Sequence, residues 1–219
     1  MKLTDLLYED VRSIWEGYLE HPFVKGIGDG TLSLDRFRFF MLQDYLYLYD
    51  YAKVFAIGVV KAKDPELMRH FSQLVYNTLN GEMEIHRKYM ARLGITETEA
   101  ASVKPSIVNT SYTRYMLEIG HTEGILELLV SILSCSWSYQ QIGAALNRIP
   151  GASEHPFYGE WIRGYTSEEY VADNQMIMDL VNELGSHCTE EEISHLKDIF
   201  RTCSRYEALF WDMSYTMSM

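Results

Sequence analysis

The stretch FRFFMLQDYLYLYDYAKVFAIGVV, residues 37–60, decides the fold class of this chain. It is apolar or aromatic nearly all round, and it is too long for a strand. Ser33 stands where a helix N-cap would stand, so the sequence predicts a long helix that runs to about Lys63. A helix of this composition belongs in the interior of a helical bundle.

The rest of the chain also reads as helices from end to end. Only five prolines interrupt it, and no convincing run of alternating strand character is present. We expect roughly eight helices in a single all-α domain that spans residues 1–219. The first expected helix is capped by Thr4, and a glycine-rich connection at 21–31 joins it to the long helix described above. The remaining expected helices cover 64–93, a short segment between Thr96 and Pro105, 106–119, 122–148, 157–163, 167–185 and the chain from Thr189 onward.

Composition and charge limit the classes of partner. Apolar residues make up 47% and charged residues 23%, which is typical of a soluble globular protein. The net charge of −12 repels phosphate backbones, so we expect no nucleic-acid partner. No run of about 18 apolar residues is present, so we expect no membrane partner.

Cysteine usage and the N-terminus indicate the compartment. Cys135, Cys188 and Cys203 are an odd number without CxxC spacing, which favours free thiols in a reducing compartment. The start of the chain, MKLTDLLYED, is polar and acidic, unlike a signal peptide. We therefore expect a cytoplasmic protein.

Asp44 is the first polar group on a face that should be buried. It shares that face with apolar and aromatic neighbours at helical spacing: Phe40, Tyr47, Tyr51 and Phe55. An unpaired buried charge is costly, so this aspartate needs either a partner or a function. One interpretation is a hydrogen bond to tyrosine hydroxyls of a neighbouring helix, and the other is a place in a binding site.

Glu207 is the second such group. In the last expected helix it shares a face with Phe200, Cys203, Phe210 and Trp211. Burial raises the pKa of a carboxyl group and lets it hold a proton near neutral pH, which suits a general acid. The alternative is a surface glutamate at the rim of the apolar stripe.

Cys135 is the third unusual position, in SILSCSWSYQQIG at residues 131–143. Ser131 and Tyr139 lie one turn either side of it, and small serines leave room beside the sulfur. A cavity bordered by a thiol, hydroxyls and a flat ring suits a planar heteroaromatic ligand, although most buried cysteines are inert. Sixteen tyrosines against nine phenylalanines fit such a pocket, and they also fit a subunit interface.

Six segments together resemble the TenA family, the thiaminase II or aminopyrimidine aminohydrolase enzymes, and its cysteine-containing type. They are FVKGIGDGTLSLDRFRFFMLQDYLYLYDYAKVFAIGVVKA, GEMEIHRKYMARLGI, NTSYTRYML, SCSWSYQQIG, WIRGYTSEEY and YEALFWDMSY. The resemblance implies a haem-oxygenase-like helical bundle that assembles as a homotetramer. It also implies that no metal or organic cofactor is needed.

The implied activity is a C–N hydrolysis in thiamin salvage. The substrate would be 4-amino-5-aminomethyl-2-methylpyrimidine, converted to the 5-hydroxymethyl pyrimidine and ammonia. Thiamin itself would be cleaved more slowly, to the same pyrimidine and the thiazole. The sequence does not rank the two substrates.

Carried over to this sequence, the resemblance makes Cys135 the nucleophile and Glu207 the acid that protonates the pyrimidine ring. The remaining implied site residues are Asp44, Tyr139 and Tyr165 as substrate-binding groups, and Tyr47 and Tyr112 as groups that support the nucleophile and the pocket.

A di-iron oxidase is the rival enzyme class, because helical bundles bind two irons through Glu-x-x-His pairs. Two such spacings occur, Glu118/His121 and Glu192/His195. The first lies near an expected helix break and the second in a polar first turn, so surface positions explain both more simply.

Three further interpretations concern His21, His86 and a role without catalysis. His21 is a conceivable haem ligand, but it precedes Pro22 in an expected turn. His86 is interpreted as a structural histidine. The same pocket would also serve a pyrimidine-binding regulator, which ammonia release would distinguish from an enzyme.

Overall fold

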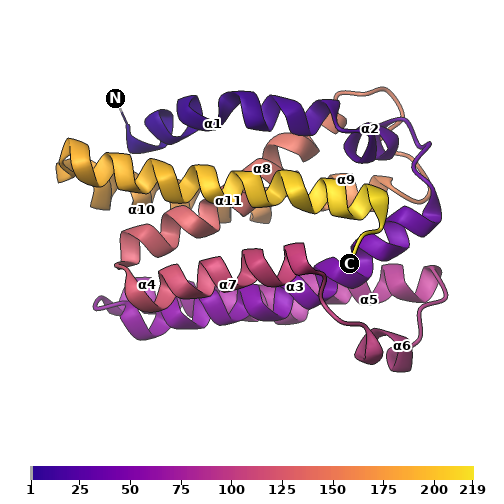
Figure 1. Cartoon of the computed structure of the whole chain (residues 1–219), viewed down its shortest axis with the longest axis horizontal. Helices are drawn as coiled ribbons and strands as arrows, with labels where there is room; N and C mark the ends of the chain where they lie inside the picture. Colours follow the sequence, from indigo (N-terminus) through magenta and orange to yellow (C-terminus); the bar gives the residue numbers. More distant parts are fainter. Residues whose placement is uncertain (1) are drawn as a thin grey trace. The chain divides into compact units, whose positions relative to one another are not determined.

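The computed structural model describes residues 2–219, and all regular structure in that range is helical (Figure 1). The prediction of an all-α fold is confirmed. The elements are α1 (Leu3–Glu20), α2 (Pro22–Gly28), α3 (Leu34–Lys61), α4 (Pro65–Asn77), the π-helical turn η1 (Thr78–Glu82), α5 (Met83–Arg92), α6 (Glu97–Ser102), α7 (Ile107–Thr122), α8 (Ile125–Leu146), α9 (Gly159–Gly164), α10 (Glu168–Leu184), the 3₁₀ turn η2 (Gly185–His187) and α11 (Glu190–Thr216).

The helices cluster into two compact units. The terminal unit comprises the chain up to Leu32 together with Leu129–Tyr215, and the central unit comprises Ser33–Leu128 with Thr216–Met219. The single domain over 1–219 stays a prediction.

Most predicted helix starts are confirmed by their caps. The side chains of Ser33, Asp64, Ser106 and Ser167 each accept a hydrogen bond from a backbone N–H in the first turn of the following helix. Thr189 and Glu192 form a reciprocal capping box at the start of α11. These caps satisfy backbone donors that have no partner within the helix, which explains why local sequence locates them well.

Two predictions about the first 31 residues are wrong. Thr4 lies inside α1, and its backbone N–H and hydroxyl both donate to Asn182 Oδ1 of α10, at 3.0 and 3.1 Å. The expected connection at 21–31 contains the short helix α2, which Pro22 and the capping side chain of His21 start. A Cβ at Gly26 would stand 3.0 Å from the Leu32 backbone nitrogen, so this glycine permits the close return of the chain.

The expected helix at 64–93 is continuous, but it contains the π-helical turn η1 between α4 and α5. Turns of this type occur inside α-helices, often at functional sites. η1 contacts α3, and its last residue, Glu82, lies four residues before His86.

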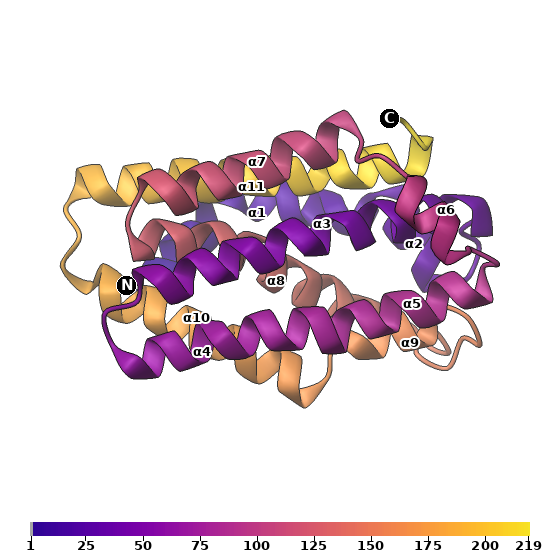
Figure 2. The same ribbon diagram turned by 90° about the horizontal axis from the view of Figure 1, so that it is seen from below.

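Helix α3 is the centre of the central unit. It packs against α4, α5 and α7, and α4 and α7 lie beside it in two views (Figures 1 and 2). Gly58 lets Phe71 of α4 approach, because a Cβ there would stand 2.4 Å from the Phe71 ring. Fully buried side chains of this unit include Phe37, Phe40, Met41, Val54, Tyr89, Tyr112 and Met116.

Helix α1 packs against α2 and α10 in the terminal unit. Buried polar bonds also tie it to α11: Trp15 Nε1 donates to Ser204 Oγ at 3.0 Å, and Tyr18 donates its hydroxyl proton to the Ser204 carbonyl. A helix interface with satisfied polar groups is rigid and specific in register.

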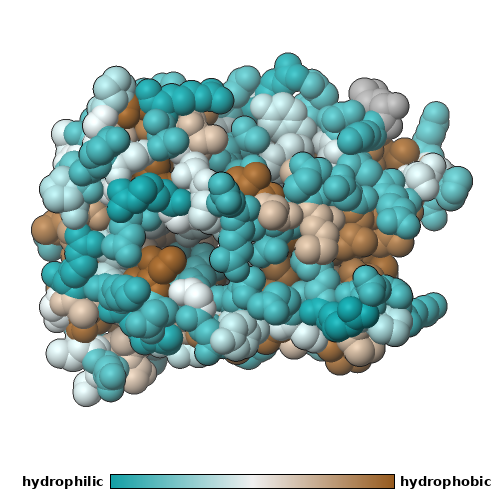
Figure 3. Space-filling view, turned by 180° about the vertical axis from the view of Figure 1, so that it is seen from behind, coloured by the Kyte–Doolittle hydropathy of each residue, from teal (hydrophilic) through white to brown (hydrophobic). Residues whose placement is uncertain are grey.

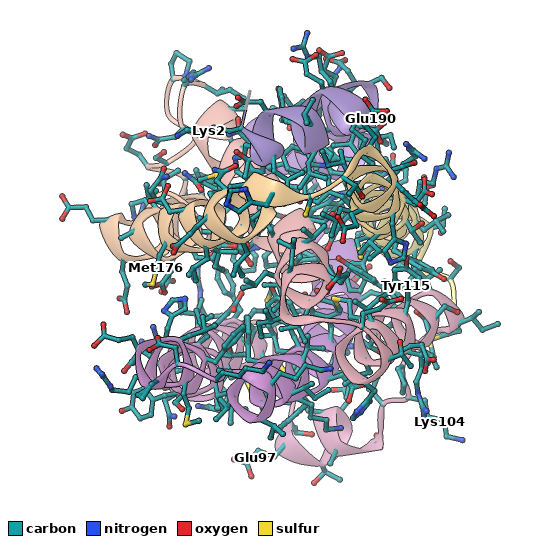
Figure 4. The ribbon with its side chains drawn as sticks, turned by 90° about the vertical axis from the view of Figure 1, so that its left-hand side faces the viewer. Lys2, Glu97, Lys104, Tyr115, Met176 and Glu190 are labelled. Carbon is teal, nitrogen blue, oxygen red and sulfur yellow. The ribbon has the colours of Figure 1, made fainter. Side chains whose placement is uncertain are left out.

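The surface is mostly polar on the face in Figure 3, with smaller hydrophobic areas. Glu97 and Lys104, at either end of the α6 segment, extend outward, and both are exposed (Figure 4). No helix within residues 2–219 combines the length and the apolar character needed to cross a bilayer.

Candidate functional site

Asp44 is buried on α3, with 5% of its surface exposed. Its partner is the imidazole of His86 on α5, whose Nε2 lies 2.7 Å from Asp44 Oδ2. The interpretation that tyrosine hydroxyls bind this carboxylate is therefore wrong. The histidine offers what a buried carboxylate requires, a partner that both hydrogen-bonds and carries charge.

His86 is held on both sides. Its Nδ1 lies 2.9 Å from the backbone carbonyl oxygen of Glu82, one turn earlier. Burial lowers the pKa of His86, but the hydrogen bond and the negative charge of Asp44 outweigh burial, so the net pKa is raised. Sequence reasoning gave His86 a structural role only, and no spacing pattern connects it with a residue 42 positions away.

Aromatic side chains surround this part of α3. Tyr47 stacks on Tyr51 with 5.3 Å between ring centroids, and Tyr112 of α7 lies 5.4 Å from Tyr47. The Tyr47 hydroxyl also lies 3.8 Å from Met116 Sδ. Asp44 and Tyr47 share one face of α3 because they are three residues apart. The predicted residues Asp44, Tyr47 and Tyr112 thus all belong to the central unit.

Cys135 lies on α8 in the terminal unit and is buried, with 8% exposed. Tyr139, one turn further on, lies 4.9 Å from Tyr165 and 5.1 Å from Trp211 between ring centroids. Gly143 makes room for this cluster, because a Cβ there would stand 2.9 Å from Tyr165 Cβ. Flat rings gathered one turn from a thiol suit a planar ligand.

Glu207 is buried on α11 with 2% exposed, so the rim interpretation is wrong. The pKa of Tyr18 on α1 indicates which groups lie near Glu207. Burial, followed by the negative charge of Glu207, raises the pKa of Tyr18 well above its usual value. The hydrogen bond with Ser204 lowers this pKa, and smaller electrostatic contributions from Cys135 and Cys203 raise it. Glu207, Cys135 and Tyr18 thus belong to one electrostatic neighbourhood.

Tyr18 is a residue of this neighbourhood that sequence reasoning missed. The sequence identifies it only as one of the apolar positions on the first helix. Its hydroxyl contacts α11 across 186 residues of chain, a relation that no local pattern reveals.

Cys203 is fully buried, and burial followed by the negative charge of Glu207 raises the pKa of its thiol well above the usual value. A thiol of this kind stays protonated and is a poor nucleophile. Cys203 therefore belongs to the packed core. Cys135, Cys188 and Cys203 are not joined in disulfides.

The serines around Cys135 have structural bonds. Ser134 Oγ lies 3.0 Å from Ser204 Oγ on α11, and Ser138 donates to the Cys135 carbonyl at 3.0 Å. The Ser136 carbonyl accepts from two side chains of α10, the Tyr170 hydroxyl and the Asn174 amide, both at 3.1 Å. These bonds fix the turn that carries Cys135 against two neighbouring helices.

A cavity of about 120 Å³ lies in the terminal unit beside α1 and α8. Its walls include Tyr8, Trp15, Tyr18, Ser138, Ile142 and Arg148, and Cys135 is not among them. Tyr18 therefore both lines this cavity and interacts electrostatically with Glu207 and Cys135.

The metal-site candidates were also located. Within residues 2–219, no three His, Cys, Asp or Glu side chains are grouped so as to hold a metal ion. Glu192 caps α11 through Thr189. His21, the conceivable haem ligand, uses Nδ1 to cap α2, and its Nε2 lies 3.2 Å from Asp212 Oδ1.

The predicted site residues form two groups. The central unit holds Asp44, Tyr47 and Tyr112, and the terminal unit holds Cys135, Tyr139, Tyr165 and Glu207. Each group is brought together within its own unit. The meeting of both groups in one pocket stays a prediction.

Known proteins match this chain over nearly its whole length. An aminopyrimidine aminohydrolase of Helicobacter pylori is 48% identical over 98% of this chain and 99% of that protein. One of Halalkalibacterium halodurans is 45% identical over 100% of this chain and 98% of that protein. The solved TenA homologue of P. horikoshii OT3 has a TM-score of 0.91 at 30% identity, covering 99% of both chains.

The fold prediction is also confirmed. Haem oxygenase-1 of Synechocystis sp. PCC6803 superposes with a TM-score of 0.66 over 97% of this chain and 91% of that one, at 13% identity, a likeness of fold alone. The sequence profile of the TENA/THI-4/PQQC family matches residues 8–217. By this match and the relatives above, the chain belongs to the TENA/THI-4/PQQC family.

Proposed function

We propose that the chain is an aminopyrimidine aminohydrolase of thiamin salvage. It hydrolyses 4-amino-5-aminomethyl-2-methylpyrimidine to the 5-hydroxymethyl pyrimidine and ammonia. The observation that carries the proposal is the common neighbourhood of the Cys135 thiol and the buried Glu207 carboxyl group. The names of the full-length relatives support the same activity.

The chemistry begins with the Cys135 sulfur. Its thiolate adds to the ring carbon beside the carbon that bears the aminomethyl arm, while a ring nitrogen takes a proton. The sulfur–carbon bond breaks the aromaticity of the ring and pushes electrons toward the arm. The C–N bond then breaks, and the amine takes a proton and leaves as ammonia. Covalent catalysis of this kind divides one difficult displacement into easier steps.

Hydrolysis then completes the cycle. Water adds to the exocyclic CH₂ and loses a proton, and the sulfur departs with the electrons of its bond as the ring regains aromaticity. The ring nitrogen returns its proton. The sum is one water consumed and one ammonia released, with Cys135 regenerated.

Glu207 is the proposed donor of the ring proton. A carboxyl group buried in an apolar stripe suits this role, because burial favours the neutral form. Tyr139 and Tyr165 hold the ring plane by stacking, so the sulfur approaches its face.

The central-unit residues complete the proposed pocket. Asp44 is the proposed hydrogen-bond partner of the aminopyrimidine edge, and Tyr47 and Tyr112 are the proposed supports of the nucleophile and the pocket. Asp44, Tyr47 and Tyr112 share one neighbourhood in their own unit, which supports a joint role.

Cleavage of thiamin is the proposed second activity. The thiazolium group replaces the amine as the leaving group on the same CH₂. It departs with the electrons of the C–N bond as a neutral thiazole and takes no proton, so the proton lost by the attacking water is released. The same residues therefore serve both substrates.

An ammonia-release assay on the aminopyrimidine, run beside thiamin, tests the function. We expect Cys135→Ser to lower turnover by a factor on the order of 10⁴ while the fold and pyrimidine binding persist. Cys188→Ser, which changes a half-buried thiol elsewhere, is the matched control and should retain wild-type activity. Near-normal turnover by Cys135→Ser would remove the covalent mechanism.

The same assay separates the alternatives. A pyrimidine-binding regulator would bind the pyrimidine and release no ammonia. A di-iron oxidase would hold two irons per chain on metal analysis of the purified protein, and its turnover would depend on them.

Assembly and compartment follow as lesser proposals. We propose a homotetramer, as the family resemblance implies. Light scattering of the purified protein measures this directly. Three cysteines that form no disulfide with one another support a reducing compartment, the cytoplasm.

A further inference from the structure

The buried pair of His86 and Asp44 is the feature that the mechanism above does not use fully. The two side chains are only 3% and 6% exposed, and Nε2 of one lies 2.7 Å from Oδ2 of the other. This distance is that of a charge-assisted hydrogen bond. A histidine and an aspartate from different helices meet here out of contact with bulk water.

The contact of the second ring nitrogen of His86, Nδ1, shows how many protons the His86–Asp44 pair holds. A backbone carbonyl oxygen accepts hydrogen bonds and never donates them, so Nδ1, which lies 2.9 Å from the Glu82 carbonyl oxygen, carries a hydrogen. If Nε2 and Oδ2 both lacked a proton, two lone pairs would face each other at 2.7 Å. One proton therefore lies between the imidazole and the carboxyl group.

The surroundings favour the imidazole as the holder of that proton. The negative charge and hydrogen bond of Asp44 favour the protonated ring even against burial. The pair is then an imidazolium beside a carboxylate, with no net charge. A neutral, hydrogen-bonded pair is far less costly to bury than a lone carboxylate.

The backbone places the imidazole. Glu82 is the last residue of the π-helical turn η1, and His86 follows it one turn into α5. The Glu82 carbonyl directs the ring through Nδ1, and the ring directs the carboxylate through Nε2. The position of Asp44 is thus set by a chain of contacts from η1.

We propose that His86 is a positioning residue for Asp44: its Nε2–H holds Oδ2, so that Oδ1 is oriented to accept the amino N–H of an aminopyrimidine. The identity of this ligand rests on the function proposed above. The hydrogen bond between the two side chains does not.

A purely structural role makes a different prediction for conservative variants. In His86→Gln, the side-chain amide nitrogen stands near the place of Nε2 and can still donate to Asp44. In His86→Asn, the shorter amide reaches the Glu82 carbonyl only. Both variants lose the imidazole ring, so both lose its packing to a similar extent.

Kinetics of ammonia release, together with melting temperatures, separate the two roles. We expect His86→Asn to raise KM for the aminopyrimidine at least tenfold with kcat changed less than threefold, and His86→Gln to restore most of the loss in KM. Equal KM values in the two variants, or a KM that follows melting temperature alone, would overturn the proposal.

Nitrogen-15 NMR of the histidine rings tests the pair without any turnover. In the wild type at neutral pH, His86 should show protons on both ring nitrogens, and in Asp44→Asn it should become a neutral ring protonated at Nδ1. A wild-type His86 that lacks a proton on Nε2 would overturn the proposal, whatever the variants do.

The same experiments separate this proposal from the proposed function. If the wild type neither releases ammonia nor binds 4-amino-5-hydroxymethyl-2-methylpyrimidine in calorimetry, the aminopyrimidine assignment fails. The NMR result then still decides whether His86 holds Asp44.

Discussion

The two buried acids of this chain have opposite neighbours. Asp44 in the central unit contacts a base, His86, at 2.7 Å. Glu207 in the terminal unit lies among Tyr18, Cys135 and Cys203, groups that become negative when they lose a proton. A cation keeps a carboxylate charged, whereas neighbouring acids oppose one another's ionisation. The comparison favours recognition of a ligand by Asp44 and donation of a proton by Glu207.

Burial alone does not distinguish these roles. Asp44 is 5% exposed and Glu207 is 2% exposed, and both lie on long helices within apolar stripes. What differs is the chemistry of the helix packed against each. α5 offers Asp44 an imidazole, and α1 offers the Glu207 neighbourhood a phenol that donates its proton elsewhere, to the Ser204 carbonyl.

Removing the acidity of Glu207 should have the largest effect. In Glu207→Gln the side chain keeps its shape but cannot donate an acidic proton, so we expect kcat for ammonia release to fall roughly 10²- to 10⁴-fold with KM nearly unchanged. Glu190→Gln, at the exposed start of the same helix, is the control. A change in KM alone would mean that Glu207 binds the substrate, the role proposed for Asp44, and does not donate the proton.

Removing the base beside Asp44 should also lower the stability of the fold. His86→Leu leaves a buried carboxylate without its cation, and breaking such a pair costs about 3–5 kcal/mol in the free energy of unfolding. Urea denaturation measures this loss, with His121→Leu at an exposed position of α7 as the control.

A double variant tests the interpretation of that loss. Replacing both partners, as Asp44→Leu with His86→Leu, removes the stranded charge and should recover much of the stability. If the double variant is as unstable as the sum of the two single ones, the pair has no coupling and the comparison between the acids breaks down.

Adding a methyl group beside the Tyr139–Tyr165 ring cluster should have a smaller effect, on both stability and substrate binding. A methyl group at Gly143 would stand 2.9 Å from Tyr165 Cβ, an atom that cannot move without the backbone. We expect Gly143→Ala to lower the free energy of unfolding by about 1–3 kcal/mol and to raise KM for the aminopyrimidine. Gly164→Ala has open space around its new methyl group and should change neither quantity much.

The fold was predictable where local chemistry decides it. Caps such as Ser33, Asp64 and Thr189 act within one helical turn, so the sequence locates them. Helix α2 was missed although Pro22 and the capping side chain of His21 mark its start, because its glycines favour an irregular connection over a helix. The turn η1 was missed because no side-chain cap marks its start.

The residues of the candidate site also fall into those that local sequence reveals and those that it does not. Asp44 and Glu207 stand out because a carboxylate interrupts an apolar helical face, and that is visible in one segment. His86 and Tyr18 were missed as site residues, because their partners lie 42 and 186 positions away. The roles of Cys135, Tyr139 and Tyr165 came from a family resemblance, since periodicity alone cannot distinguish a reactive thiol from an inert one.

The pH dependence of stability is the smallest expected effect. It tests whether Asp44 has a cationic partner, the protonated imidazole of His86. A pKa raised by folding means that the folded chain binds the His86 proton more tightly than the unfolded chain. The contribution of His86 is therefore fully present below the pKa of an unfolded histidine, about 6.5, and is lost as the pH rises through the raised folded value. Asp44 and Glu82 are the charged groups that raise it.

The measurement compares urea unfolding of the wild type and His86→Gln across this range. Glutamine does not titrate, so the stability difference between the two proteins should shrink as the pH rises past the folded pKa of His86. A difference that grows with pH would mean that folding lowers the pKa of His86, because burial would then outweigh Asp44. Asp44 would in that case lack a cationic partner, and the contrast with Glu207 would disappear.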